Sequence, residues 1–290
     1  MTTLPAYPKH PEPEDVKQAA PDDQRFWSVT TIIGTLDKPA LVYWSADMTA
    51  QAAINDHDIW GPMAAKDPAE AHRWLTGARF RKPAGQTRSA TELGTAVHAA
   101  IEEYTLTGIR PELDPDDEVI PYLEQFDAWA QRFQPEYQAA EVTVYHPEYG
   151  YAGTCDAFLT VDGVRFIADY KTTRKSYDSK GKPTGPYPEV ALQLAAYRYA
   201  ALAAVWRPRR VEQFRRRYYL LSPEEQAAAV PVPEVDTGLV IHLTPEHCTA
   251  HPVDCGQGTF DYFLFALEIA RWTFDASKKV IGDVLDRPEV

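Results

Sequence analysis

The sequence predicts an α/β protein, and three observations support this prediction. Residues Asp162-Gly163 are a strong signal for a two-residue β-hairpin turn, and the runs on both sides are rich in Val, Ile, Phe and Thr. Further strands are predicted at about 141–145, 215–221 and 238–243. Amphipathic helical patterns lie before and after the hairpin, at about 89–107, 121–133, 189–205 and 260–274.

The composition is that of a globular protein. The chain has 290 residues, of which 44% are hydrophobic and 12% aromatic, so it can bury a full core. It contains no run of 18 apolar residues that would predict a membrane span, and its start has neither the basic nor the apolar part of a secretory signal. The three cysteines form no disulfide framework. We therefore expect a cytoplasmic protein without a membrane partner.

Composition also divides the chain into three parts. Residues 1–24 contain five prolines among acidic residues, so we expect a disordered or extended arm. Residues 25–85 are expected to form a helical N-terminal elaboration, whose tryptophans favour packing over stacking on bases. Residues 86–285 are expected to form the main domain.

The net charge of −13 is unfavourable for binding nucleic acid, because phosphate contacts need a basic surface. The basic residues are unevenly distributed, however. One cluster surrounds the hairpin and the Gly- and Pro-rich loop at 174–188, and a second lies at 207–217. A local positive groove is therefore compatible with the sequence. If the chain binds nucleic acid, the candidate contact residues in these clusters are Arg174, Lys175, Lys180, Lys182, Arg215 and Arg217.

The hairpin brings two carboxylates together. If residues 162–163 form the turn, counting back along both strands places Asp156 opposite Asp169. The alternation of side chains along a strand puts Lys171 on the same face as Asp169. Opposed like charges destabilise a strand pair, whereas a divalent cation between the oxygens makes the pair favourable. We therefore favour a metal site over a solvated sheet face.

The two faces of the hairpin differ in character. The charged face also carries Phe158 and Ile167, which indicates that another element covers it. The opposite face is almost wholly apolar and should lie on a core; it carries Cys155, Ala157, Leu159, Val161, Val164, Phe166, Ala168 and Tyr170.

Two of the predicted helices carry polar residues at helical spacing. On the first, Gly94, His98 and Glu102 lie four residues apart along one stripe, and the glycine leaves room for the close approach of another backbone. On the helix after the hairpin, Gln193 and Tyr197 lie four residues apart beside an apolar side. A buried amide must be hydrogen-bonded, so a structural role for the glutamine remains open beside a functional one.

His247, Cys248, His251 and Cys255 form another group of residue types that bind metals. Their spacing matches no common zinc-site pattern. We therefore favour ordinary loop residues, and metal binding by this group stays open.

The order of the motifs resembles the PD-(D/E)XK nuclease superfamily, in its RecB-like exonuclease branch. That branch includes CRISPR-associated and bacteriophage exonucleases. An isolated Asp-x-Lys is a weak signal, whereas several elements in this order and spacing are specific. The resemblance covers about residues 89–197 and extends loosely to residues 28–44. Its motifs are Gly94-Thr95-x-x-His98, Gly153-Thr154-x-Asp156, Asp169-Tyr170-Lys171-Thr172 and Gln193-x-x-x-Tyr197.

The resemblance implies a restriction-endonuclease-like αβββαβ core, a central mixed sheet flanked by helices. It also implies roles for single residues. The implied metal ligands are His98, Asp156, Asp169 and the backbone carbonyl of Tyr170, with Glu141 or Glu102 left open as a further acidic member. The implied catalytic residues are Asp156, Asp169, Lys171, Gln193 and Tyr197.

The function implied by the resemblance is a DNA exonuclease that hydrolyses phosphodiester bonds in phage or bacterial recombination or repair. It would use one or two Mg²⁺ or Mn²⁺ ions and act on single-stranded DNA or duplex ends, with a recombinase or a single-strand-binding protein as a partner. Some CRISPR-associated relatives hold an iron–sulfur cluster with four cysteines. This chain has three, so no cluster is expected.

Three alternatives remain beside this interpretation. The same fold serves flap or branched-DNA endonucleases, and it also serves DNA-binding subunits that have lost activity. A metal-dependent hydrolase of a different substrate is the third. The residues do not decide the cleavage polarity, the strand preference or the oligomeric state.

Overall fold

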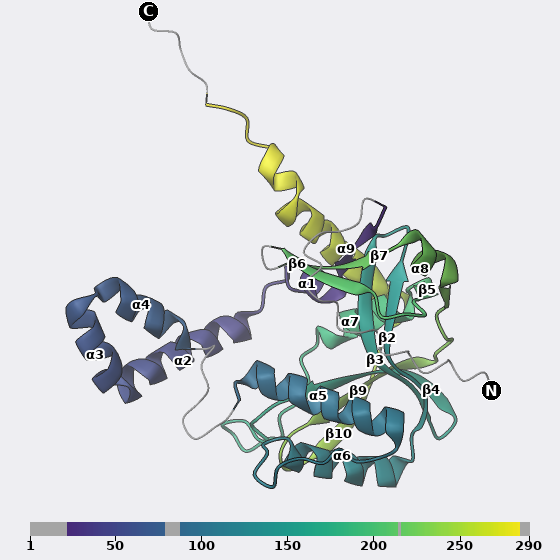
Figure 1. Cartoon of the computed structure of the whole chain (residues 1–290), viewed down its shortest axis with the longest axis horizontal. Coiled ribbons are helices and arrows are strands. Elements are labelled where there is room, and N and C mark those ends of the chain that lie inside the picture. The colour runs from purple at the N-terminus through teal and green to yellow at the C-terminus, as the bar shows by residue number, and fades with distance from the viewer. Residues whose placement is uncertain (1–21, 79–87, 214–215, 285–290) are drawn as a thin grey trace, which may run out of the picture.

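The computed structural model describes residues 22–78, 88–213 and 216–284 (Figure 1). In this described part, ten strands form one mixed sheet that is flanked by helices, as the sequence predicts. The strands are β1 (Gln24–Ser28), β2 (Glu136–His146), β3 (Tyr151–Val161), β4 (Val164–Thr172), β5 (Leu202–Ala203), β6 (Arg209–Gln213), β7 (Arg216–Leu221), β8 (Val230–Pro231), β9 (Thr237–Leu243) and β10 (Cys248–Val253). The helices are α1 (Val29–Ile33), α2 (Pro39–Asn55), α3 (His57–Lys66), α4 (Pro68–Thr76), α5 (Ala90–Thr107), α6 (Ile120–Phe133), α7 (Val190–Arg198), α8 (Pro223–Ala228), α9 (Gln257–Phe274) and the 3-10 turn η2 (Ala276–Lys279).

The sheet forks along one edge of β3. The start of β3 pairs in parallel with β1, at Tyr151 and Ala152, and its end pairs antiparallel with β4, from Ala157 to Val161. Residues 153–156 lie between these two pairings, where β1 and β4 diverge. The opposite edge of β3 pairs with β2. The fork therefore opens beside the middle of β3, the strand that the β2–β3 and β3–β4 hairpins share.

The hairpin has the predicted turn and register. Asp162 and Gly163 both have positive φ angles, of 49° and 80°, as a type I′ turn requires. Val161 pairs with Val164, and the pairing continues residue by residue to Ala157 and Ala168. Because the next residues along each strand are the two aspartates, the turn places both of them at the mouth of the fork.

Both faces of the hairpin are buried, each against different helices. Leu159, Phe166 and Ala168 pack with α5 and α6, which confirms the predicted apolar face. Phe158 and Ile167 pack with α1, α7 and α9, which are the covering elements expected from these two side chains. The central sheet is therefore enclosed between two helical layers (Figure 1).

Cys155 departs from the predicted alternation. It packs with Phe158 and Ile167 rather than with Ala157 and Leu159, and its thiol donates to the carbonyl oxygen of Ala157 at 3.3 Å. The reason is local, because residue 156 lies outside the regular pairs with both neighbouring strands and strict alternation is lost there.

Helix boundaries follow the local signals, with one exception. Ser89 caps α5 in a capping box with Glu92, and Gly108 ends it in the left-handed conformation. The helix predicted at 189–205 ends earlier, at Arg198, because Leu202 and Ala203 pair with β2 and β8 instead. Tertiary strand pairing therefore overrides the helical propensity of this alanine-rich stretch.

The expected N-terminal elaboration is smaller than residues 25–85. It begins with β1, which pairs with β3 and β7 inside the main sheet, and with α1, which packs on α9. Only α2–α4 stand apart from the sheet (Figure 1). Residues 1–21 of the expected arm lie outside the described residues. Among the described helices, none combines the length and the apolar character that a membrane crossing needs.

Gly153 and Gly94 are expected to respond in opposite directions to the same change. An alanine Cβ at Gly153 would meet the Tyr197 ring at 2.3 Å, whereas one at Gly94 meets nothing within 4 Å. Gly153→Ala should destabilise the fold by about 1–3 kcal/mol through overpacking. Gly94→Ala should stabilise α5 by up to about 1 kcal/mol, because alanine is the better helix former.

Urea unfolding of the two variants measures both effects. Equal stability of Gly153→Ala and the parent chain would contradict the packing of Tyr197 on this glycine. Gly94 leaves open space, as predicted, and no backbone of the described residues fills it.

Candidate active site at the fork of the sheet

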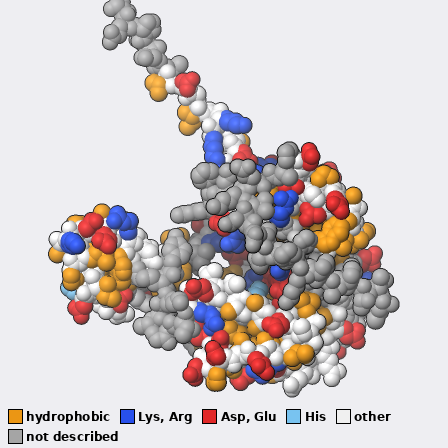
Figure 2. Space-filling model, in the orientation of Figure 1, with side chains coloured by type: hydrophobic (Ala, Val, Ile, Leu, Met, Phe, Trp, Pro, Cys, Tyr) orange, Lys and Arg blue, Asp and Glu red, His pale blue; other side chains and the backbone are white. Residues whose placement is uncertain are grey.

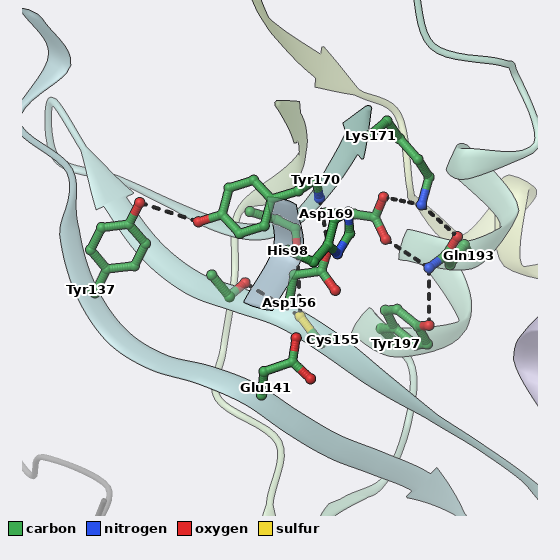
Figure 3. Close-up of polar contacts among 12 residues, drawn as sticks. His98, Tyr137, Glu141, Cys155, Asp156, Asp169, Tyr170, Lys171, Gln193 and Tyr197 are labelled. Atoms are coloured by element: carbon green, nitrogen blue, oxygen red, sulfur yellow. Dashed lines mark hydrogen bonds and ion pairs between the residues drawn. The ribbon is translucent and has the colours of Figure 1, made fainter. Parts of the chain in front are cut away.

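The fork gathers polar side chains from five elements (Figure 3). They come from α5, from the three neighbouring strands β2, β3 and β4, and from α7. All the residues with a predicted catalytic role meet here, together with the predicted histidine. They are His98, Asp156, Asp169, Lys171, Gln193 and Tyr197.

Three carboxylates lie on the neighbouring strands β2, β3 and β4, beside the fork. Glu141 lies between the residues that pair with Ala157 and Cys155, and the regular β3–β4 pairs end at Ala157 and Ala168, one residue before Asp156 and Asp169. Glu141 itself has a φ of 52°, which is uncommon for a residue with a side chain. Such strain persists where the surroundings impose it, often at functional sites. Burial of three acids so close together needs compensation by positive or donor groups.

Asp169 receives that compensation from Lys171 and Gln193. Its side chain is only 1% exposed, and the Lys171 ammonium forms an ion pair with Oδ2. The Gln193 amide nitrogen donates to Oδ1 at 2.7 Å and to the Tyr197 hydroxyl at 3.1 Å. Lys171 in turn donates to the Gln193 amide oxygen at 3.4 Å. The polar pair predicted on α7 therefore orients both the acid and the lysine of β4.

Asp156 is directed toward α5. Its Oδ2 accepts from the backbone N–H of Tyr170 at 2.7 Å and lies 3.6 Å from His98 Nδ1. Burial and the charge of Asp169 raise the pKa of Asp156 well above the usual carboxyl range. Burial lowers the pKa of His98, so its imidazole is neutral at pH 7. A neutral imidazole is the form that binds metals.

Lys171 keeps its charge in this environment. Burial alone would lower the pKa of its ammonium, but the charges of Asp169 and Asp156 outweigh burial and raise it. The side chain is 37% exposed, and its ammonium contacts Asp169 and Gln193. A fixed positive charge is therefore held beside the acids of the fork.

Glu141 and Glu102, which the sequence left as alternatives, belong to the same cluster. Arg207 contacts both, at 3.2 Å from Glu141 and 3.5 Å from Glu102. Burial, Asp156 and Glu102 raise the pKa of Glu141 to about 7. The sequence analysis missed Arg207 as a site residue. No motif marks it, since it lies in a connection between two short strands.

The donor types suit a divalent cation, although the protein's own groups occupy the acids. No set of three His, Cys, Asp and Glu side chains in the described ranges could hold a metal ion as it stands. The acids are bound instead by Lys171, Gln193 and the Tyr170 N–H. Several carboxylates and a neutral imidazole are the ligands that Mg²⁺ and Mn²⁺ accept. The His98 ring lies edge-on to the ring of Tyr170, the residue predicted to supply a carbonyl ligand, with 6.0 Å between the ring centroids.

The expected DNA contacts fall into three groups. Lys175, Lys180 and Lys182 are exposed in the loop that follows β4. Arg174 is half-buried, because its guanidinium binds Glu118 at 3.0 Å and the carbonyl of Arg88, so it anchors the loop to the α5–α6 region. Arg217 is exposed and lies 3.6 Å from Glu212, and Arg215 lies outside the described residues.

A cleft of about 470 Å³ adjoins Lys171 and Gln193. Its wall includes His242, a buried residue of β9 that pairs with Lys171 and that the sequence analysis did not select. Burial and two neighbouring histidines lower its pKa to about 4. Its Nε2 lies 3.1 Å from the Thr173 hydroxyl. His242 is therefore a neutral wall residue beside the ammonium of Lys171.

The zinc group predicted as an alternative does not assemble. Cys248 and His251 lie on β10, Cys255 is buried beside Arg198, and His247 packs against Tyr177. No three of these side chains are arranged to bind a metal within the described ranges. All three cysteines of the chain are free.

Comparisons with known proteins leave the family undecided. No family model matches the chain, and no curated protein matches it. Among solved structures, the one described as the crystal structure of SSO0001 aligns with 63% of this chain and 71% of its own, at 13% identity and a TM-score of 0.29. A likeness at that level carries no argument about fold or function.

Glu141→Gln is expected to become more stable than the parent chain as the pH rises. The Glu141 pKa of about 7 exceeds that of an unfolded glutamate, so the folded chain binds the extra proton between about pH 4 and 7. The proton on Glu141 therefore stabilises the folded parent chain below this pH range. The free energy of unfolding of the parent chain should fall by roughly 3 kcal/mol in total as the pH rises through the range. Glutamine does not titrate, so the free energy of unfolding of Glu141→Gln should increasingly exceed that of the parent chain over this range.

Urea unfolding at several pH values between about 4 and 8 tests the effect. The matched control is Glu148→Gln, an exposed acid outside the site, which should show no such trend. A constant difference between Glu141→Gln and the parent chain would contradict the raised pKa.

Proposed function

We propose that the chain is a metal-dependent deoxyribonuclease of the RecB-like branch of the PD-(D/E)XK superfamily, acting as an exonuclease on DNA. One observation carries this proposal. The fork joins Asp156, Asp169 and Lys171 to the histidine of α5 and to Gln193 of α7 in one contact network. These are the residues whose order along the chain resembles that family.

The order of elements supports the same conclusion. Helices α5 and α6 precede the antiparallel strands β2, β3 and β4, and α7 then leads to β9, which runs parallel to β4. With β5–β8 and α8 left out as insertions between α7 and β9, this order is compatible with the αβββαβ core that the resemblance implies. The two motif acids and the lysine all lie on the central hairpin of that unit.

Asp156, Asp169 and neutral His98 would hold the divalent ion, Mg²⁺ or Mn²⁺. Such an ion lowers the pKa of its water and neutralises charge on the phosphoryl oxygen. The carboxylates suit this role because burial and the negative charge of Asp169 destabilise the ionised form of Asp156, so a cation bound beside it would be strongly attracted. The neutral imidazole has a free lone pair for the same purpose.

Lys171 provides a fixed positive charge beside the reacting phosphate. Its raised pKa keeps it protonated, and its partial exposure lets the ammonium reach a substrate oxygen. A compact ammonium placed in advance stabilises charge that develops in the transition state. Gln193 holds the lysine and Asp169 in their relative positions, and Tyr197 orients the Gln193 amide.

Exposed lysines beside the fork support DNA as the substrate. Lys175, Lys180 and Lys182 lie on the loop that begins where β4 ends, next to Lys171. Because the whole chain carries a charge of −13, binding should depend on this local basic surface and weaken with salt. A recombinase or a single-strand-binding protein that receives the processed DNA is the partner class that fits an exonuclease.

Asp169→Asn and Lys171→Ala are expected to lower the rate of DNA hydrolysis at least about 100-fold, as removal of a preorganised charged group does. The assay is digestion of end-labelled linear DNA and closed circular DNA, each single- and double-stranded, with Mg²⁺ or Mn²⁺. The matched controls are Asp116→Asn and Lys279→Ala, two exposed residues outside the fork and outside the proposed DNA-binding loop. Thermal unfolding confirms that the variants fold.

The same assay separates the alternatives. Loss of linear DNA with intact circles supports the exonuclease. Cleavage of single-stranded circles would favour a flap or branched-DNA endonuclease, and binding without any cleavage would favour a DNA-binding subunit. Full activity of either variant would contradict the roles assigned to Asp169 and Lys171.

A further inference from the structure

The arginines at 207–217 differ in what their charges contact. Three of them are neutralised by an acid outside the fork, in the ion pairs Arg209–Asp23, Arg216–Asp275 and Arg217–Glu212. Arg215 lies outside the described residues. Arg207 and Arg210 are both exposed, and both contact residues at the fork of the sheet. These two arginines therefore need a separate explanation.

Arg210 is held at the fork by uncharged groups. Its Nη2 donates to the Thr154 hydroxyl at 2.6 Å, and its guanidinium lies over the Tyr219 ring at 5.2 Å from the ring centroid. Thr154 belongs to the interval of β3 that pairs with neither β1 nor β4, two residues before Asp156. No carboxylate of the described residues forms an ion pair with Arg210. Its positive charge is therefore fixed in place but not neutralised.

Arg207 uses a single nitrogen of its guanidinium to contact the acids. Its Nη2 lies 3.2 Å from Glu141 and 3.5 Å from Glu102. Its Nε and Nη1 have no hydrogen-bond partner among the residues that the structure describes. The side chain is 47% exposed, so these donors can meet a ligand from solvent. Arginine presents its donors in one plane, in a geometry that suits two oxygens of a phosphate.

The two arms of the fork carry basic groups on both sides of the acids. Strand β4 forms one arm, which carries Lys171 and leads into the loop with the exposed lysines. The second arm runs from β1 through β7 to β6, where Arg210 lies, and Arg207 comes just before β6. Figure 2 shows a hollow between the upper and lower parts of the molecule, with basic, acidic and histidine side chains in it. In the same view, β6 and β7 lie in the upper part and α5 in the lower part (Figure 1).

The acids at the fork outnumber the bases that contact them. Lys171 and Arg207 contact a group of four carboxyl groups, which are Glu102, Glu141, Asp156 and Asp169. An approaching phosphate is repelled by this excess of negative charge unless further cations offset it. Arg210 supplies such a cation beside the acids, and its contacts with Thr154 and Tyr219 fix it before a ligand arrives. A group ordered in advance loses little conformational entropy on binding.

We propose that Arg207 and Arg210 bind backbone phosphates of the DNA on the second arm of the fork. This inference rests on the proposed function, since it names the groups that hold the substrate at that site. It moves the DNA contact of the arginine cluster from Arg215 and Arg217, the candidates selected from the sequence, to the two arginines at the fork. Arg207 has a second effect, because its charge competes with a divalent ion for the two glutamates that it contacts.

The phosphate contacts are tested by binding of a fluorescein-labelled single-stranded oligonucleotide to the full chain, in EDTA to prevent hydrolysis. Arg207→Ala and Arg210→Ala should each weaken binding about 10-fold, as loss of a hydrogen bond to a charged group does. Each should also reduce the slope of log K against log salt by about 0.7–1. Arg210→Lys should recover part of the affinity, because it keeps the charge without the planar donors. The matched control is Arg217→Ala, an exposed arginine paired with Glu212, which should change the affinity less than about twofold.

Mn²⁺ binding without DNA tests the second effect of Arg207. Arg207→Ala should bind Mn²⁺ about 10-fold more tightly than the parent chain, because Glu141 and Glu102 lose a neighbouring positive charge. Arg207→Lys and Arg210→Ala should bind Mn²⁺ like the parent chain. The electron paramagnetic resonance signal of free Mn²⁺ measures this affinity. Partial unfolding would weaken both DNA and Mn²⁺ binding, so opposite shifts in Arg207→Ala exclude a merely structural role.

The outcomes separate this inference from the proposed function. Parent-like DNA affinity and salt slope in both alanine variants would overturn the inference, while DNA hydrolysis by the parent chain would leave the proposed function standing. An equal loss of affinity in Arg217→Ala would also overturn it, because the cluster would then act only through its overall charge. Unchanged or weaker Mn²⁺ binding by Arg207→Ala would refute the competition assigned to Arg207. A parent chain that neither binds nor hydrolyses DNA would refute the inference and the proposed function together.

Discussion

Burial of like charges at the fork is the constraint on which the site depends. Glu141, Asp156 and Asp169 lie on three neighbouring strands beside the fork, close to a hydrophobic core that disfavours each of their charges. The protein compensates with donors from separate elements. Lys171 and Gln193 bind Asp169, and the Tyr170 N–H binds Asp156. A site with this arrangement attracts a further positive charge, and that property underlies the proposed chemistry.

The fork itself arises from competition between two strands for one edge of β3. Strand β1 pairs with the start of that edge and β4 pairs with its end. Residues 153–156 pair with neither strand, so side chains can pack against this part of β3. Gly153 lies in this interval, and the absence of its side chain lets the Tyr197 ring pack directly on the strand. Tyr197 then accepts from the Gln193 amide. Sheet topology, one glycine and one aromatic ring thus set the position of Gln193, which contacts Lys171.

Helix α1 and helices α2–α4 differ in how they are attached to the main domain. Helix α1 belongs to the main domain, since it packs on α9 and follows β1 directly. Helices α2–α4 are connected through a short segment and pack mainly on one another. Their exposed side chains are more apolar than a solvated surface requires, and the same is true of the outer side of α9.

The sequence by itself determined those features that depend on near neighbours in the chain. The turn at Asp162-Gly163 needs two positive φ angles, which aspartate and glycine tolerate, and the turn sets the register of the β3–β4 pairs as far as Ala157 and Ala168, the residues next to Asp156 and Asp169. The ends of α5 follow from Ser89 and Gly108 in the same way. Each of these depends on backbone preferences within a few residues.

Only the tertiary structure decided the features that depend on distant segments. The direction of Asp156 toward His98, the strained Glu141 and the contact of Arg207 with two acids all lie where regular pairing stops. The early end of α7 and the place of β1 in the sheet depend on strands far away in sequence. Side-chain alternation predicts direction only within a continuous ladder, and pairing partners outside it are chosen by packing of the whole domain.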